Sequence, residues 1–326
     1  MMVLDPAVQG PHRPVTGPPG RAPGSVRRTS SIDTARPAGL GGPLHIEGRA
    51  RDLVTDADGR ATVVGEAGLD LHVDPDYHVV DVRSQPAVPA LGRLVGSVVG
   101  PGFRRRVDEL VPEERQAGSL LYLLLDDLPG AALVSGYALL QGGAIPVTPE
   151  HRAAMLSRSD LCAGWAGDGS LMSLIRLNGG SPTPIGPSAP PLGSPDDDLA
   201  WHQLAPLPTD GMRRCRRLDV ISPTAGRGGR HRIDAFFRDS HVADAGRETV
   251  LHEYSVDATV DAAGEHLVTI SASADVLPWV ECPAATASAA RLEGAPLAGL
   301  RPAGAQRGAF GIAIPPRARL GLVAGN

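Results

Sequence analysis

The side chains with the clearest chemical potential lie in the last third of the sequence, where Cys, His and acidic residues cluster. Cys282 precedes Pro283 and an Ala-rich run, the pattern of a helix that begins with Pro. A thiol at a helix N-terminus ionises more readily, because free amides and the helix dipole stabilise the thiolate. Cys282 is therefore a candidate nucleophile or metal ligand. Its apolar neighbours Trp279 and Val280 equally suit an inert, buried thiol.

Four further side chains could act together with Cys282. His252 and Glu253 lie in one predicted strand, and Asp239 and His241 lie at the end of another. Imidazole serves as acid, base or metal ligand near neutral pH, so convergence of these groups would form an acid-base or metal site. Their spacing matches no local metal-binding motif, and no cofactor can be named. The competing interpretation is a set of core His residues and structural ion pairs.

Two alternating segments position these groups. Apolar and polar residues alternate over 250–260 and again over 266–274 after a Gly-containing turn, which predicts an antiparallel hairpin. We expect His252 to point inward, because the opposite register would instead bury Glu253 and Asp257. Burying these charged side chains would cost several kcal/mol of stability.

An earlier part of the chain repeats the design of this region. Residues 27–52 and 213–239 each contain an Arg-rich strand, a Gly-containing turn and a second strand that ends in Arg-Asp. Matching His-containing and Gly-containing motifs follow in the same order. The pattern predicts an α+β protein of two related units, each a small antiparallel sheet backed by helices, packed as a pseudo-dimer. Chance similarity in an Arg- and Gly-rich sequence is the alternative.

Composition divides the chain into five regions. Residues 1–24 are rich in Pro and Gly without periodicity and predict a disordered leader. Residues 25–177 form the first unit with extra helices, 178–210 a Pro-, Gly- and Ser-rich linker, and 211–301 the second unit. Residues 302–326 contain no acidic residue and no helical stripe, so we expect an irregular tail of the kind that a frameshift or truncation produces.

Charge and composition narrow the possible partners. The formal net charge of −5 argues against a general nucleic-acid surface, because phosphate binding needs clustered excess positive charge. We find no apolar run of membrane-spanning length and no signal-peptide core, so we expect a cytoplasmic protein without a membrane partner. Three widely spaced Cys residues predict neither a disulfide framework nor a paired-Cys zinc site.

Several segments resemble a bacterial family known as the domain-of-unknown-function 2889 family. They are LCAGW at Leu161–Trp165, FRDSHV at Phe237–Val242, VLHEYSV at Val250–Val256 and LPWVECP at Leu277–Pro283, with a further similarity at Arg27–Asp33. The family has no established activity, so the resemblance implies a grouping and no mechanism. Its members typically end in a Cys-Thr-His-Leu segment that opens a final helix, and this chain has none.

These observations support two functional hypotheses. The first is a binding or interaction protein whose partner is a small molecule or another protein. The alternative is an enzyme or metal-dependent protein with a His, Glu and Cys site in the second unit. A pKa of Cys282 below the ordinary value of about 8.5 would favour the alternative.

Overall fold

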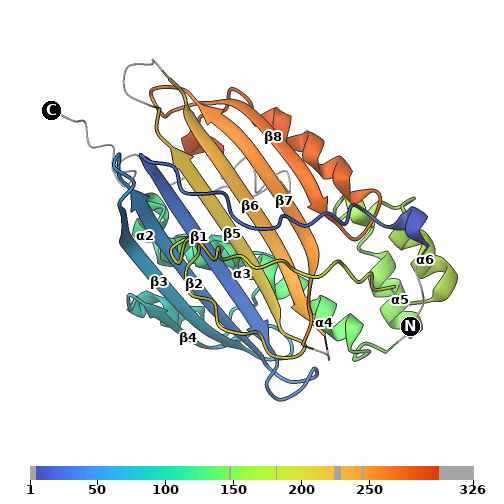
Figure 1. The fold of residues 1–326 in the computed structure, drawn as a ribbon. Helices are drawn as coiled ribbons and strands as arrows, with labels where there is room; N and C mark the ends of the chain where they lie inside the picture. Colours follow the sequence, from blue (N-terminus) through green and yellow to red (C-terminus); the bar gives the residue numbers. More distant parts are fainter. Residues whose placement is uncertain (1–4, 147, 181, 224–228, 244–245, 301–326) are drawn as a thin grey trace.

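The chain folds around one antiparallel sheet that has helices on one face and extended segments on the other (Figure 1). The computed structural model describes residues 5–146, 148–180, 182–223, 229–243 and 246–300. The expected irregular tail at 302–326 therefore lies outside the described residues.

The sheet has eight strands in the order β4-β3-β2-β1-β5-β6-β7-β8. The strands are β1 (Ser25–Ala35), β2 (Leu44–Thr55), β3 (Ala61–Val73), β4 (Val79–Gln85), β5 (Met212–Ile221), β6 (His231–Val242), β7 (Glu248–Val260) and β8 (Leu267–Val276). The predicted α+β class is confirmed. The prediction of two separate small sheets is wrong, because β1 pairs with β5 along its length and joins the halves into one continuous sheet.

The two halves of the sheet, β1–β4 and β5–β8, have the same internal register. Ser30 of β1 lies opposite Arg216 of β5, which is its counterpart in the second half, so the pairing is symmetric about this point. Register shifts also recur at equivalent places, after Asp52 where β2 meets β3 and after Asp239 where β6 meets β7. A local two-fold axis therefore passes through the β1–β5 pair.

Two equivalent ion pairs flank this axis. Arg27 of β1 binds Asp219 of β5 through two hydrogen bonds of 2.6 and 2.8 Å. Arg213 of β5 binds Asp33 of β1 in the same way, at 2.7 and 2.6 Å. The Arg27 and Asp219 side chains are almost fully buried. A fork of two parallel bonds fixes strand register as well as charge, because a guanidinium fits a carboxylate in one geometry.

Helices cover one face of the sheet, which we call the helical face. The helices are α1 (Phe103–Leu110), α2 (Pro112–Ala117), α3 (Leu120–Val134), α4 (Gly136–Gln141), α5 (Pro149–Leu156) and α6 (Ser170–Asn178). Short 3-10 segments are η1 (Pro6–Val8), η2 (Pro89–Leu94), η3 (Ala163–Trp165), η4 (Cys282–Leu292) and η5 (Leu297–Gly299). Helix α3 packs on β1, β2 and β3 with Leu124, Leu125 and Leu128 fully buried.

The expectation of no apolar run of membrane-spanning length is wrong: the stretch Leu120–Gln141, which spans α3 and α4, is long and apolar enough by composition to cross a membrane. Buried core helices of water-soluble proteins have the same composition, and half of its most apolar window is buried inside this fold.

Two extended segments cross the opposite face, which we call the strapped face (Figure 1). The first strap is residues 5–24, which the sequence predicts to be a disordered leader. It forms backbone hydrogen bonds with the sheet, such as the one from the Arg13 amide to the Asp275 carbonyl. The second strap is residues 182–210, expected as a linker, and its Pro187 carbonyl accepts from the Val250 amide. Neither segment has regular periodicity, because it is held by the sheet rather than by its own secondary structure.

Arginines of the sheet hold the straps by donating to strap carbonyls. Pro-rich segments carry carbonyl acceptors but few amide donors, so a buried strap needs donors from elsewhere. The guanidinium groups supply them with bonds of 2.5 to 3.2 Å. The pairs are Arg27 with Pro19 and Ala200, Arg51 with Leu199, Arg213 with Ala205, and Arg238 with Val15 and Pro190.

The second strap also buries a histidine at the centre of the sheet. The two ring nitrogens of His202 lie 2.8 Å from the hydroxyl oxygens of Thr29 and Ser31. Burial, together with the nearby positive charge of Arg51 and Arg213, lowers the pKa of His202 to about 3. The ring is therefore neutral in the folded protein at physiological pH.

This histidine predicts a pH-dependent stability. Below about pH 6.5, the ordinary pKa of His, the unfolded chain binds a proton at residue 202 that the folded protein does not bind. The contribution of His202 to stability is therefore complete above about pH 6.5 and decreases as the pH falls below it. We expect the free energy of unfolding to be about 2 kcal/mol lower at pH 5 than at pH 7. Urea unfolding at the two pH values measures the difference, and His202→Gln should reduce it. An unchanged difference in the variant would assign the effect to other groups.

The central ion pairs predict a second effect on stability. Asp219→Asn leaves the Arg27 guanidinium buried without its carboxylate, which should lower the free energy of unfolding by about 3–5 kcal/mol. The control is Asp257→Asn, which removes an exposed pair with Arg232 and should cost less than about 1 kcal/mol. Similar costs in urea unfolding would show that the central pair does not hold the halves together.

Candidate functional site

The structure brings together two of the five residues that the sequence singles out. Asp239 lies opposite His252 across β6 and β7, with His252 Nδ1 3.0 Å from Asp239 Oδ2. His252 lies on the helical face with Tyr254 and Val256, the face that the alternation predicts, and its side chain is 29% exposed. This pair has the geometry of a base oriented by a carboxylate.

The Asp239 carboxylate of that pair is also bound by an arginine. Arg214 donates two bonds to Asp239, at 2.8 and 3.0 Å, and a third of 3.2 Å to Asp127 of α3. Arg216 binds Asp127 at 2.6 and 2.8 Å, and both guanidinium groups lie about 5 Å from the centre of the Phe237 ring. Burial alone would raise the pKa of Asp127 and of Asp239, but the arginines outweigh it and hold both below the ordinary range. The arrangement is a structural ion-pair network between α3 and the sheet.

Glu253 does not join this group, because it lies on the strapped face. It is fully buried, pairs with Arg238 and accepts a bond from the Val15 amide of the first strap. Burial raises the pKa of Glu253, although Arg238 acts in the opposite direction. The expectation that the opposite register is needed to bury Glu253 is therefore wrong: both faces of β7 are covered here.

His241 lies near the end of β6, two residues after Asp239. Its ring meets Tyr137 of α4 edge-on, with centroids 5.2 Å apart, and its Nε2 is 3.9 Å from Asp210. The candidates thus lie on both faces of the sheet, with Glu253 on the strapped face and the Asp239–His252 pair on the helical face. The predicted convergence into one acid-base or metal site does not occur.

Cys282 has the surroundings of a structural thiol. It is the first residue of η4, and Glu281 occupies the N-cap position predicted for it. The side chain is 7% exposed and packs against Trp279 and against Gly164 of the LCAGW segment. Burial raises the pKa of Cys282 to about 12, so the thiolate that nucleophilic or metal chemistry requires is disfavoured.

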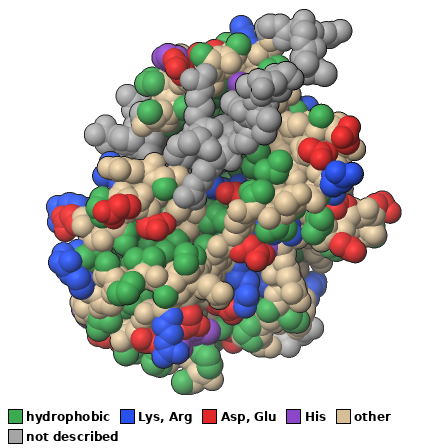
Figure 2. Space-filling view, turned by 90° about the vertical axis from the view of Figure 1, so that its left-hand side faces the viewer, with side chains coloured by type: hydrophobic (Ala, Val, Ile, Leu, Met, Phe, Trp, Pro, Cys, Tyr) green, Lys and Arg blue, Asp and Glu red, His purple; other side chains and the backbone are tan. Residues whose placement is uncertain are grey.

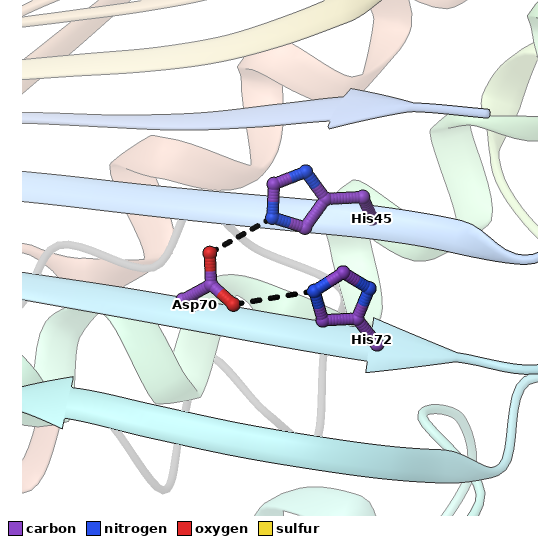
Figure 3. A group of neighbouring side chains, drawn as sticks. All are labelled: His45, Asp70 and His72. Carbon is purple, nitrogen blue, oxygen red and sulfur yellow. Dashed lines mark hydrogen bonds and ion pairs between the residues drawn. The ribbon is translucent and has the colours of Figure 1, made fainter. Parts of the chain in front are cut away.

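A different group of polar side chains emerges only from the folded structure. His45 of β2 faces His72 of β3, and Asp70 lies two residues before His72 on the same face (Figure 3). Asp70 contacts His45 Nε2 at 2.9 Å and His72 Nε2 at 3.4 Å. The potential ligand atoms of the three residues lie within 4.8 Å of one another. Sequence spacing could not reveal this group, because His45 and His72 meet only through strand pairing; placing the two segments as a second hairpin would have found it.

Comparison with known protein families gives one match, which lies in the second half of the chain. Residues 212–307 match the model of a family described as a protein of unknown function (DUF2889). The resemblance is confirmed. The match covers β5 to η5, whereas the similar segments at Arg27–Asp33 and Leu161–Trp165 lie outside it. No curated protein and no solved structure matches the chain.

The environment of Cys282 predicts low thiol reactivity. We expect iodoacetamide at pH 8 to modify exposed Cys162 and to leave Cys282 unmodified until the protein unfolds, because burial suppresses the thiolate. Mass spectrometry of tryptic peptides identifies the modified residue. Modification of folded Cys282 at the rate of Cys162 would restore it as a candidate nucleophile.

Proposed function

We propose that this protein is a binding protein rather than an enzyme, and that it binds through the part of the strapped face formed by β2, β3 and β4. We call this surface the open face. Eight charged or imidazole side chains on this surface are exposed or half-buried. They are His45, Glu47, Arg49, Glu66, Asp70, His72, Asp81 and Arg83.

The observation that carries the proposal is a difference between the two halves. In the second half, Phe236 and Glu253 point to the same face and are buried beneath the straps, beside Val15 and Trp201. Arg49 and Glu66 occupy the equivalent strand positions in the first half and are exposed. At these two positions the second half is covered by its own chain, while the first half is exposed to solvent, which is the arrangement expected of a surface that receives a ligand.

Exposed apolar side chains of β3 and β4 also favour binding. Val63 and Val64 of β3 and Val80 of β4 are 41%, 56% and 58% exposed. Figure 2 views the molecule from the side on which β3 and β4 lie in Figure 1, and hydrophobic side chains gather there among charged ones. Polar groups next to apolar surface are typical of binding sites.

The alternative, an enzyme or metal-dependent protein with its site in the second half, has weaker support. The contact between His252 and Asp239 favours it, but Arg214 occupies the carboxylate and Glu253 lies on the other face. The raised pKa of Cys282 argues against thiol chemistry. In keeping with the net charge of −5, we propose a small molecule, an ion or a protein as partner, with no nucleic acid or membrane, and a cytoplasmic location.

We also infer that the two halves are copies of one unit, now fused at the β1–β5 pair. The equivalent registers, the matched register shifts and the paired contacts of Arg27 and Arg213 support this inference. A residue of one half can therefore be replaced by the residue at the equivalent strand position of the other half.

The proposal is tested by a thermal-shift screen of metal ions, anions and small metabolites. We expect a stabilising ligand whose effect disappears in the double variant His72→Thr, Asp81→Thr. This variant copies Thr259 and Thr269 of the second half, which face each other with their hydroxyls 2.7 Å apart, so the strands should accept it.

Asp257→Asn serves as the control, because it changes an exposed carboxylate on the second half. It should leave the ligand effect intact. Stabilisation that persists in the double variant, or a screen without any stabilising ligand, would contradict binding through the open face.

A further inference from the structure

We infer that His45, Asp70 and His72 bind a divalent transition-metal ion of the zinc class. This inference rests on the proposed function and names the class of ligand that the open face receives. Two imidazole nitrogens and a carboxylate oxygen form a donor set that suits zinc, cobalt, nickel or copper, whereas magnesium and calcium prefer sites made of oxygen atoms.

The three donor groups already converge on one point. Both Nε2 atoms are directed at the Asp70 carboxylate, one at each oxygen, and the two rings stack with centroids 4.5 Å apart and an interplanar angle of 17° (Figure 3). A tetrahedral zinc ion with bonds of about 2.0–2.1 Å needs donors roughly 3.3 Å from one another. The donor atoms lie within 4.8 Å, so small side-chain rotations complete the geometry.

The strands hold these side chains in a defined position. His45 and His72 are direct cross-strand neighbours, and a register shift follows His72 where β3 meets β4. The residues that flank the histidines, which include Ile46 and Leu71, are fully buried on the helical face. A donor set on well-packed strands loses little conformational freedom when it binds an ion.

In the second half, an arginine side chain provides positive charge at the equivalent position. Arg232, Asp257 and Thr259 stand where the first half has His45, Asp70 and His72, and Arg232 binds Asp257 at 3.2 Å. The first half keeps the aspartate but replaces the permanent positive charge by two imidazoles, which are neutral ligands when they coordinate a metal. A bound metal ion then supplies the missing positive charge.

The surroundings leave room for further ligands on the solvent side. The Asp70 and His72 side chains are 42% and 48% exposed, so a water molecule or a group from a partner can complete the coordination shell. Asp81 lies opposite His72 on β4, and Glu47 lies opposite Asp70 on β2. These carboxylates can orient metal-bound water or imidazole from the outer shell.

The test is calorimetric titration of the full chain with Zn²⁺ after removal of metal by a chelator. We expect binding of one ion, and a fall in affinity of at least about tenfold in His45→Arg and in His72→Thr. Both substitutions copy the second half, so they should preserve the fold, which urea unfolding checks. His78→Gln is the control: His78 is an exposed histidine 3.3 Å from Asp74, and its removal should leave affinity unchanged.

A second measurement does not depend on any variant. In the wild-type protein, Zn²⁺ should shift the imidazole NMR signals of His45 and His72, and Co²⁺ should give the visible absorption of a site with nitrogen and oxygen ligands. Absence of Zn²⁺ binding, or binding that neither shifts these signals nor weakens in both variants, would overturn the inference.

The result also separates this inference from the proposed function. If Zn²⁺ fails to bind while another ligand from the screen is lost in the open-face double variant, only the metal inference is wrong. If the stabilising ligands act elsewhere on the protein, both are wrong.

Discussion

The reciprocal pairing of arginine and aspartate between β1 and β5 is the interaction on which the rest of the structure depends. Arg27 with Asp219 and Arg213 with Asp33 place four charges at the middle of a sheet, where apolar residues are usual. Removing charges from water is costly, and the cost is offset only when geometry is good and the remaining donors are used. The bidentate pairs meet the first condition, and bonds to strap carbonyls meet the second.

The straps follow from this polar centre. A face with guanidinium groups needs a cover that offers acceptors, because unused donors would otherwise be buried. On the helical face, Asp127 of α3 meets this need for Arg214 and Arg216. Extended Pro-rich chain is a suitable cover, since its carbonyls accept from the arginines and it offers few donors of its own. The same reasoning explains why the helical face has its leucine-rich helix α3 over the first half, where β2 and β3 present Ile46, Leu69 and Leu71.

Local pattern was a sound guide to the fold within each half. Alternation correctly predicted the β7–β8 hairpin and placed His252 on the helical face. The Arg-Asp motifs mark equivalent positions of β2 and β6, but both strands continue three residues further instead of ending there. The joining of the halves through β1 and β5 was not predictable, because edge pairing leaves no periodic signal. Residues 5–24 look disordered for a similar reason: their order comes from contacts with distant strands.

The candidate site was less accessible from the sequence than the fold. The reactivity of Cys282 depends on burial, which the helix-start pattern alone does not determine. Alternation alone places Glu253 toward solvent, because it does not reveal the straps that cover this face. His45 and His72 are distant enough in sequence that only strand register brings their rings together.

The local two-fold axis has a consequence for how such a protein can change over time. In a dimer of identical chains, every substitution appears twice and must suit both copies at once. Here the two equivalent halves of the sheet share one chain, so each position can vary alone. The second half has Arg232 and Thr259 where the first has His45 and His72, and only the second half is covered by the straps at Phe236 and Glu253. Continuity of the chain thus allows a symmetric framework to carry an asymmetric surface.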